Sequence, residues 1–308
     1  MAAPSASVKA RAAEDGDLEE GTLMLVYYNG HYMQETEVCL PPYERGFQFA
    51  DGVYEVIRCY YGVFFQTEAH LARMARGLRE LRIQAPDLSA FPAIIQRLVE
   101  ENNHDQEQAI AYLQVTRGAY SPRRHWFPPA GTPPTVYIST SPFKPHWEEI
   151  EQGVKVILEE DIRWLRCDIK SIALLPNVLS RQRAIDQGAV EAMWARDGFM
   201  TEGTHCNVGF VKDGTFYTPP LSNLILPGVT RAVVLRLCEE LGVPAKEVEV
   251  PRSELAQFDE AMLIGTTVEI TPIVQIGEMQ VGTGVPGPIT RRLQEAFYEK
   301  VLPAGARP

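Results

Sequence analysis

The sequence predicts an α+β protein of two domains. Its 308 residues are too many for one small domain and suit two of modest size. In each half, strand-like and helix-like segments are mixed and turn signals join neighbouring strands, which favours antiparallel pairing over regular βαβ repeats. Hydrophobic residues make up 45% of the chain and charged residues 22%, which is typical of a globular protein with a real core. A mainly disordered or fibrous chain is thereby excluded.

The first half begins with strands and continues with helices. An apolar run over 23–28 ends at Asn29-Gly30, a strong hairpin signal, and residues 31–37 form the expected returning strand. β-Branched and aromatic residues predict further strands over 52–61, 63–66, 109–117 and 134–140. Apolar residues spaced three and four apart predict helices over 70–81 and 91–101.

The second half repeats this mixture. Strands are expected over 154–158, 188–194, 207–212, 215–218 and 260–264, and helices over 176–188, 230–241 and 289–302. Thr230 lies near the start of its helix, and Gly242 follows the end of the same helix, where glycine is favoured.

The domain boundaries follow from composition. Residues 1–20 are small and polar without periodicity, which predicts a mobile tail. Residues 141–147 contain two prolines and little periodicity, which predicts a linker. We therefore expect a smaller N-terminal domain over 21–140 and a larger C-terminal domain over 148–308.

Charge and cysteine usage exclude several classes of protein. The net charge is −11 and there is no basic cluster, so neither nucleic acid nor an anionic membrane is an expected partner. No apolar stretch approaches the roughly 18 residues of a membrane span, and the N-terminus has no signal-peptide pattern. The cysteines are odd in number, five, and scattered. We expect no disulfide framework, no metal site and a cytoplasmic location.

Lys170 is the first candidate for chemistry. It lies between Ile169 and the run Ser171–Leu175, an apolar setting that disfavours the charged form of the amine. A neutral amine is a nucleophile that forms Schiff bases with aldehydes. A structural lysine at a strand end remains the alternative for this residue taken alone.

Two loops and a carboxylate accompany this lysine. The residues 226–231 open a helix and the residues 265–267 follow a buried strand, and both offer N–H groups and hydroxyls for a phosphate. Glu202, expected in a loop between strands, would suit the ring nitrogen of a pyridine cofactor. The loop over 121–126 carries two arginines and a histidine that can clamp a carboxylate, although it can equally be a solvated corner.

Several longer motifs make the pattern specific. They occur in a fixed order along the chain: YERGFQFADGVYE over 43–55, VTRG over 115–118, DIRWLRCDIK over 161–170, TEG over 201–203 and TVEITP over 267–272. From about Tyr27 to the last helix the chain resembles the bacterial D-amino-acid aminotransferases. These are fold-type IV pyridoxal-phosphate enzymes, related to the branched-chain aminotransferases and aminodeoxychorismate lyases.

The resemblance implies a role for each matching residue. Lys170 is expected to hold pyridoxal 5′-phosphate as a Schiff base and to transfer the proton. Glu202 matches the carboxylate that pairs with the pyridine nitrogen. The remaining cofactor contacts match Arg73, Leu226, Val229, Thr230 and Thr266. The implied reaction is ping-pong transamination between a D-amino acid and a 2-oxo acid.

The family also implies how the substrate carboxylate is bound. Its carboxylate trap matches Tyr54, Arg123 and His125, and in the family the loop with the arginine and histidine comes from the partner subunit, which implies a homodimer. The loop at 118–121 is one residue longer than the family pattern, Arg124 adds a second guanidinium, and His205 and Cys206 replace smaller residues.

Three other functions stay open at this point. An aminodeoxychorismate-lyase-type enzyme or an R-selective amine transaminase would use the same cofactor. A non-catalytic module that binds a phosphorylated ligand would use the Thr230 and Thr266 loops and leave Lys170 idle.

Overall fold

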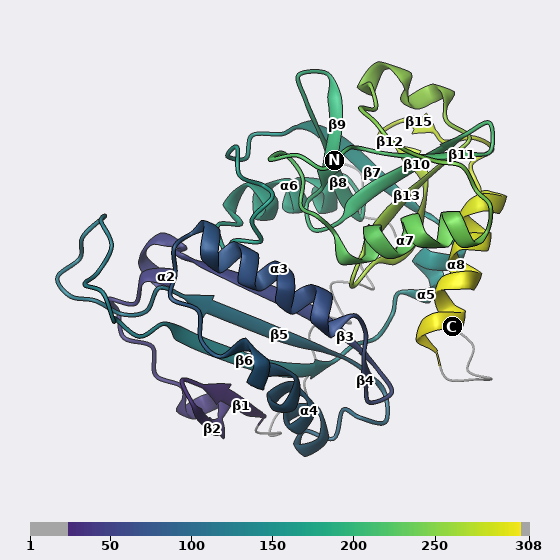
Figure 1. Ribbon diagram of the computed structural model, residues 1–308. Helices are drawn as coiled ribbons and strands as arrows, with labels where there is room; N and C mark the ends of the chain where they lie inside the picture. The colour runs from purple at the N-terminus through teal and green to yellow at the C-terminus, as the bar shows by residue number, and fades with distance from the viewer. Residues whose placement is uncertain (1–23, 303–308) are drawn as a thin grey trace. The chain divides into compact units, whose positions relative to one another are not determined.

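The computed structural model describes residues 24–302, which divide into two compact units (Figure 1). Of these residues, the N-terminal unit comprises 24–144 and 169–174, and the C-terminal unit comprises 145–168 and 175–302. The predicted tail over 1–20 lies outside the described residues. The division after residue 144 falls within the segment predicted as a linker. Residues 169–174, which the predicted boundaries assigned to the C-terminal domain, pack within the N-terminal unit.

The N-terminal unit is built on a six-stranded sheet in the order β2-β1-β6-β5-β3-β4. All neighbouring strands are antiparallel. The central pair, β3 and β5, is in register from Gly52 opposite Thr116 to Tyr60 opposite Gln108. The strands are β1 (Leu25–Tyr28), β2 (His31–Gln34), β3 (Gly52–Tyr60), β4 (Val63–Phe64), β5 (Gln108–Thr116) and β6 (Thr135–Pro142).

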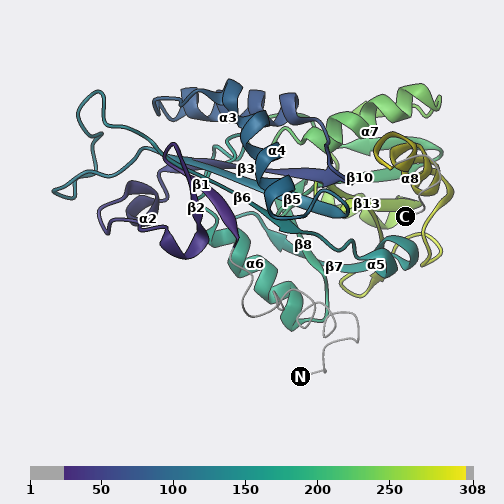
Figure 2. The ribbon, with the colours of Figure 1, turned by 90° about the horizontal axis from the view of Figure 1, so that it is seen from below.

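Two helices, α3 (Thr67–Glu80) and α4 (Phe91–Glu101), pack against this sheet (Figure 2). Alternate strand residues face them, so Met74 of α3 and Ile95 of α4 share one hydrophobic core with Val53. Gly77 lets α3 approach closely, since a Cβ there would lie 3.0 Å from the Val53 side chain. A short helix, α2, and two 3-10 turns complete the unit: α2 (Arg45–Phe49), η1 (Glu35–Glu37) and η2 (Leu88–Ala90).

The C-terminal unit contains a nine-stranded sheet in the order β12-β11-β10-β13-β14-β7-β8-β9, with β15 paired to β14. The β7–β8, β7–β14 and β11–β12 pairs are parallel, and the others are antiparallel. The α+β prediction is therefore confirmed. The strands are β7 (Val154–Glu160), β8 (Glu191–Arg196), β9 (Phe199–Gly203), β10 (Asn207–Lys212), β11 (Thr215–Thr218), β12 (Ala245–Glu247), β13 (Glu260–Gly265), β14 (Glu269–Ile276) and β15 (Met279–Gln280).

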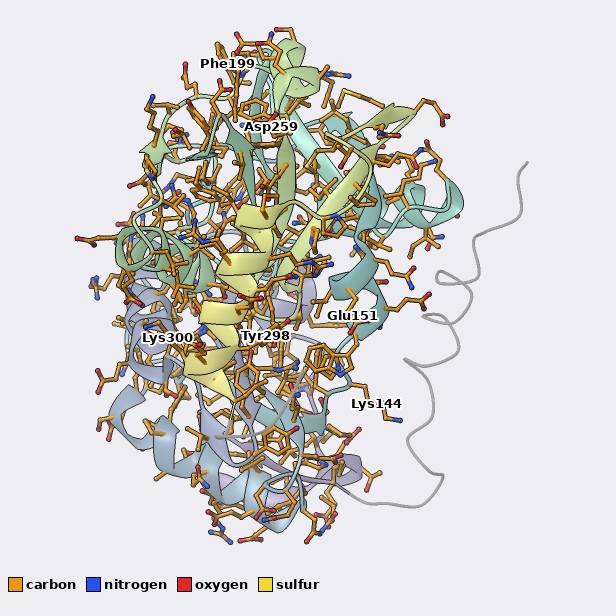
Figure 3. All side chains as sticks on the ribbon, turned by 90° about the vertical axis from the view of Figure 1, so that its right-hand side faces the viewer. Lys144, Glu151, Phe199, Asp259, Tyr298 and Lys300 are labelled. Carbon is orange, nitrogen blue, oxygen red and sulfur yellow. The ribbon has the colours of Figure 1, made fainter. Side chains whose placement is uncertain are left out.

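The helices of this unit include a closing pair, α5 and α8, held together by side chains (Figure 3). The ring of Tyr298 on α8 lies edge-on to Trp147 on α5, with 5.9 Å between centroids. Lys300 on α8 forms an ion pair of 2.8 Å with Glu240 on α7. The helical segments are α5 (Trp147–Gln152), α6 (Leu175–Asp186), α7 (Val229–Glu240), the 3-10 turn η3 (Arg252–Gln257) and α8 (Pro288–Val301).

Most expected elements are confirmed, and the differences have local causes. Helix 91–101 is found with its predicted bounds. The returning strand ends at Gln34, because a 3-10 turn follows. Four strands were missed: the short β12 and β15, β9, whose buried residues include polar ones, and β14, whose Pro272 argues against a central strand. Within residues 24–302, no helix has the length and apolarity to cross a membrane.

Candidate active site

Lys170 belongs to the N-terminal unit because its segment pairs with the start of β3. The Tyr54 N–H donates to the Lys170 carbonyl at 3.0 Å, and the Ile172 N–H donates to the Gly52 carbonyl at 3.1 Å. These bonds fix the lysine main chain on the strand edge. The Lys170 ammonium nitrogen lies 4.2 Å from the centre of the Tyr54 ring, so the structure brings these two predicted site residues together.

A buried carboxylate, Glu55, binds two side chains of helix α3. Arg73 donates to it through Nε and Nη2, each at 2.7 Å, and His70 Nδ1 lies 2.8 Å from Oε2. Burial opposes the charge of Glu55, but Arg73 and His70 overcome this and lower its pKa to about 2. Burial lowers the pKa of His70 despite Glu55, with further contributions from Arg73 and Lys170. Arg73, the predicted phosphate ligand, is therefore held by two hydrogen bonds to a buried carboxylate.

The predicted carboxylate trap is not assembled by the contacts of a single chain. Tyr54 packs beside Tyr112, with ring centroids 5.9 Å apart. Arg123 instead lies over the ring of Phe49 at 4.4 Å, and the His125 ring is 5.5 Å from the same phenylalanine. The loop that carries them is exposed and is held to α2 by Arg45, which donates to the Arg124 carbonyl at 2.7 Å.

In the C-terminal unit, Glu202 lies on β9 and is buried, which corrects its predicted place in a loop. Its carboxylate contacts Arg163 Nη1 at 2.5 Å. It also accepts from the Leu226 N–H at 2.9 Å and from Asn207 Nδ2 at 3.1 Å. Burial raises the pKa of Glu202, and Arg163 opposes this rise.

The arginine that holds Glu202 is a residue that sequence reasoning did not single out. Arg163 also binds Asp161 at 2.8 Å, and Asp161 is in turn 3.1 Å from Arg196. Despite burial, Glu202 and Asp161 raise the pKa of Arg163, so the guanidinium stays charged. Arg163 and Asp161 both lie within the motif 161–170, but their spacing alone does not indicate that they face a strand about forty residues later.

Two of the predicted phosphate-binding residues of this unit, Val229 and Thr230, begin helix α7. Its N-cap is Gly228, which has no side chain with which to cap the N–H groups of Val229 and Thr230. Leu226 precedes this end and is bonded to Glu202. Thr266 lies half-buried in the turn between β13 and β14.

The donor set fits pyridoxal phosphate. Glu202 is a buried carboxylate with its position fixed by three donors, which suits a protonated ring nitrogen. The start of α7 offers N–H groups where the N-cap residue has no acceptor side chain, which suits a phosphate. In the N-terminal unit, Lys170 offers a primary amine fixed by its main chain.

Residues 52–276 match the family described as amino-transferase class IV. The chain belongs to this family. A D-alanine aminotransferase from Bacillus licheniformis is 41% identical to this class IV aminotransferase over 286 residues, which cover 92% of this chain and 99% of the relative.

Solved structures agree with the family. The Escherichia coli branched-chain amino acid aminotransferase has a TM-score of 0.85 and 26% identity, and the match covers 91% of this chain and 95% of that chain. A branched-chain amino acid aminotransferase from T.th., solved with pyridoxamine 5′-phosphate, has a TM-score of 0.84 and 25% identity, and the match covers 93% of this chain and 96% of that chain. The predicted fold-type IV, PLP-dependent aminotransferase is confirmed.

Proposed function

We propose that this class IV aminotransferase exchanges amino groups between a D-amino acid, such as D-alanine, and a 2-oxo acid, such as 2-oxoglutarate. The observation that carries the proposal is the 41% identity with a D-alanine aminotransferase over 92% of the chain. The first substrate leaves as its 2-oxo acid before the second oxo acid takes up the amino group. The two half-reactions therefore balance without any further co-reactant.

Each unit contains residues that the family resemblance assigns to the cofactor. When bound, pyridoxal phosphate supplies an aldehyde and an electron-withdrawing ring that acidifies the substrate Cα–H. Lys170 would hold the cofactor through Nζ, and its amine would move the proton at the substrate Cα. Glu202, kept in place by Arg163, binds the ring nitrogen. Arg73 and the groups at Val229, Thr230 and Thr266 bind the phosphate, and Leu226 packs against the ring.

The substrate carboxylate would be bound by Tyr54 of one subunit and by Arg123 and His125 of a second copy. Support comes from the contacts of Arg123 and His125, which are with Phe49 and leave both side chains exposed. Bidentate guanidinium binding favours a planar carboxylate, and an amine without one would gain nothing from it.

Exposed apolar side chains support a homodimer. In the N-terminal unit, Phe47 is 72% exposed and Trp126 is 67% exposed. In the C-terminal unit, Leu175 and Val178 of α6 are 69% and 60% exposed. Exposed apolar side chains that group on one helix, as Leu175 and Val178 do, mark sites where another protein surface binds.

We also propose a cytoplasmic location. All five cysteines are unpaired thiols, and four of them are buried. Unpaired thiols are typical of a reducing compartment.

The activity is tested with D-alanine and L-alanine in separate assays with 2-oxoglutarate, following pyruvate formation. We expect turnover with D-alanine and none with L-alanine. In Lys170→Ala, which lacks the amine that moves the proton, turnover with D-alanine should fall by at least roughly a thousandfold. Lys144→Ala is the control, because Lys144 is an exposed lysine of the same unit.

Other results would change the assignment. Turnover with L-alanine alone would indicate a branched-chain-type enzyme. Pyruvate release from aminodeoxychorismate without an oxo acid would indicate a lyase, and preference for an amine over D-alanine would indicate an amine transaminase. Near-normal turnover in Lys170→Ala would overturn the role of this lysine.

A further inference from the structure

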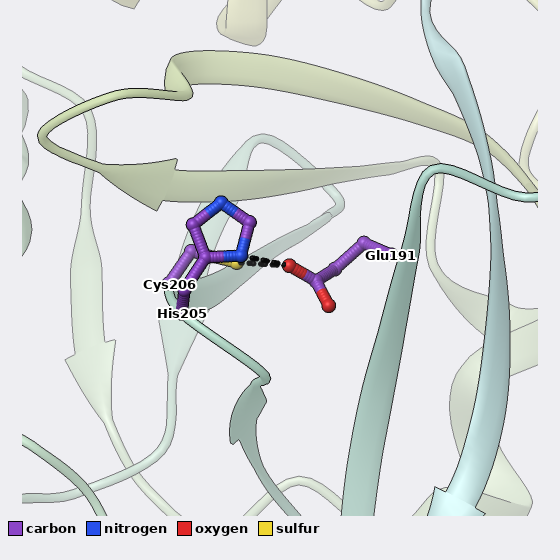
Figure 4. A group of neighbouring side chains, drawn as sticks. All are labelled: Glu191, His205 and Cys206. Carbon is purple, nitrogen blue, oxygen red and sulfur yellow. Dashed lines mark hydrogen bonds and ion pairs between the residues drawn. The ribbon is translucent and has the colours of Figure 1, made fainter. Parts of the chain in front are cut away.

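Three side chains that the transamination does not use converge in the C-terminal unit (Figure 4). Glu191 begins β8, and His205 and Cys206 lie in the turn between β9 and β10. Glu191 Oε2 is 2.6 Å from His205 Nδ1 and 3.7 Å from Cys206 Sγ. Each of these side chains offers one atom that could bind a metal ion. Within residues 24–302, they form the group of three histidine, cysteine or acidic residues whose potential ligand atoms all lie within 4.8 Å of one another.

The two carboxylate oxygens of Glu191 have different partners. Oε1 accepts from the Ala192 N–H at 2.7 Å and from the Thr204 hydroxyl at 2.5 Å, so the turn and the strand hold it. Oε2 faces His205, Cys206 and the Arg181 guanidinium, whose Nη1 is 3.3 Å away. One oxygen therefore anchors the carboxylate, and the other is presented to an imidazole and a thiol.

The main chain at Gly203 leaves room for the Cys206 sulfur. Gly203 lies directly beside it, since a Cβ at this position would be 2.6 Å from Cys206 Sγ. The Gly203 N–H donates to the Cys206 carbonyl at 2.7 Å and closes the turn. Glu191 is fully buried, whereas the side chain of His205 is 34% exposed, which leaves one side of the cluster open to solvent.

We propose that Glu191, His205 and Cys206 form a binding site for a single thiophilic divalent cation of the Zn²⁺ or Cd²⁺ class, with water as the fourth ligand. This inference goes beyond the proposed function and does not depend on it. A carboxylate, an imidazole and a thiolate are a ligand set that zinc accepts.

Of the two ligand distances from Glu191, one is close to the spacing that such a cation needs and the other is shorter. Tetrahedral zinc lies about 2.3 Å from sulfur and about 2.0–2.2 Å from nitrogen and oxygen, so its ligand atoms are about 3.4–3.6 Å apart. The Cys206 to Glu191 distance of 3.7 Å is already near this value. The His205 to Glu191 distance of 2.6 Å is that of a hydrogen bond and must lengthen by about 0.8 Å as the cation enters.

Binding exchanges protons for the metal. In the metal-free protein, the Cys206 thiol donates a hydrogen bond to Glu191 Oε2 at 3.7 Å. The sulfur–hydrogen bond then breaks as the sulfur–metal bond forms, and the thiol proton passes to solvent. His205 binds through Nδ1 and carries its remaining proton on Nε2.

Arg181 competes with the cation for the same oxygen. Its guanidinium is a positive charge 3.3 Å from Glu191 Oε2, and its side chain is 22% exposed on α6. It can turn towards solvent, but its charge repels a divalent ion. Removing this charge should therefore strengthen metal binding, the opposite of what loss of a ligand would do.

The test uses the holoenzyme and Cd²⁺ as the probe. Titration is followed by the thiolate-to-cadmium charge-transfer absorbance and by equilibrium dialysis with metal analysis. We expect one Cd²⁺ per chain with a thiolate band that is absent in Cys206→Ala, and an affinity lowered by roughly tenfold or more in His205→Ala. Arg181→Gln should raise the affinity by roughly tenfold. Cys39→Ser, which changes the exposed cysteine, should keep both band and affinity.

Other results of the same titrations would contradict the proposed cation site. A wild-type protein without a thiolate band, or a Cys206→Ala variant with the same band, overturns the site. Weaker binding in Arg181→Gln contradicts the competition. Since His205 is partly exposed, its variant should fold normally, and unchanged affinity in that variant also overturns the site.

Discussion

Glu55 keeps a full negative charge in the interior of the N-terminal unit because α3 places two nitrogen-bearing side chains around it. Burial by itself would favour the neutral acid, but Arg73 and His70 lower the pKa of Glu55 to about 2. Since this value is below the ordinary 4.5, the pair stabilises the fold above pH 4.5, and the stabilisation is lost as the pH falls towards 2.

Glu55→Gln should therefore destabilise the protein, since Arg73 would be left buried without its carboxylate. We expect the free energy of unfolding to fall by about 3–5 kcal/mol at pH 7, measured by urea denaturation. The loss of stability between pH 4.5 and 2 should also become shallower. Glu101→Gln, which breaks the exposed Arg97–Glu101 pair, is the control and should change stability little. Equal effects of the two substitutions would contradict the role of Glu55.

At the scale of elements, β9 and the start of α7 are joined through one side chain. Asn207 Nδ2 donates both to Glu202 at 3.1 Å and to the Leu226 carbonyl at 3.0 Å. Gly228, the N-cap of α7, leaves room for it, since a Cβ there would lie within 1.9 Å of Asn207 Oδ1. The carboxylate proposed for the ring nitrogen and the helix end proposed for the phosphate are therefore held in one arrangement.

Gly228→Ala should disturb both groups by displacing the Asn207 amide. We expect the affinity of the apoenzyme for pyridoxal phosphate to fall by roughly tenfold or more, the cost of about 1–3 kcal/mol for a lost buried hydrogen bond. The visible absorbance during titration with the cofactor measures it. Asn207→Ala should have a similar effect because it removes the same bonds. Wild-type affinity in both variants would show that this connection does not position the cofactor.

At the scale of the whole molecule, the proposed site needs groups from two copies of the chain. Lys170 and Tyr54 are contributed by one copy, whereas Arg123 and His125 would be contributed by the other. A homodimer of Arg123→Ala, or of Lys170→Ala, should then contain no intact site. A mixed dimer of the two variants should contain one damaged and one intact site.

Co-expression of these two variants should restore about a quarter of the wild-type activity, because half of the dimers are mixed and each has one intact site. Activity per chain is measured with D-alanine, and each variant expressed alone is the control. If Arg123 acts within its own chain, every site in the mixed dimer carries one defect, and no activity returns. The assay thus distinguishes a shared site from a site within one chain.

Local patterns in the sequence determined most of the secondary structure, because the spacing of apolar residues and the turn residues act over a few positions. The helix over 91–101 and the hairpin at Asn29-Gly30 are examples. The sequence also determined the family, since the motif ending at Lys170 is long and specific. Strand β14 could not be predicted from local patterns, because Pro272 is unfavourable in a strand. Pairing with the two neighbouring strands, β13 and β7, stabilises it in the folded protein.

Only the tertiary structure decided which charges meet. Arg163 and Glu202 are 39 residues apart, and Glu191 and Cys206 are 15 apart, so no local periodicity connects them. The same holds for Lys170, whose segment joins the N-terminal unit through hydrogen bonds to β3. Buried ionic groups are stable only when distant parts of the chain supply their partners, and those partners are fixed by strand order and register rather than by neighbouring residues.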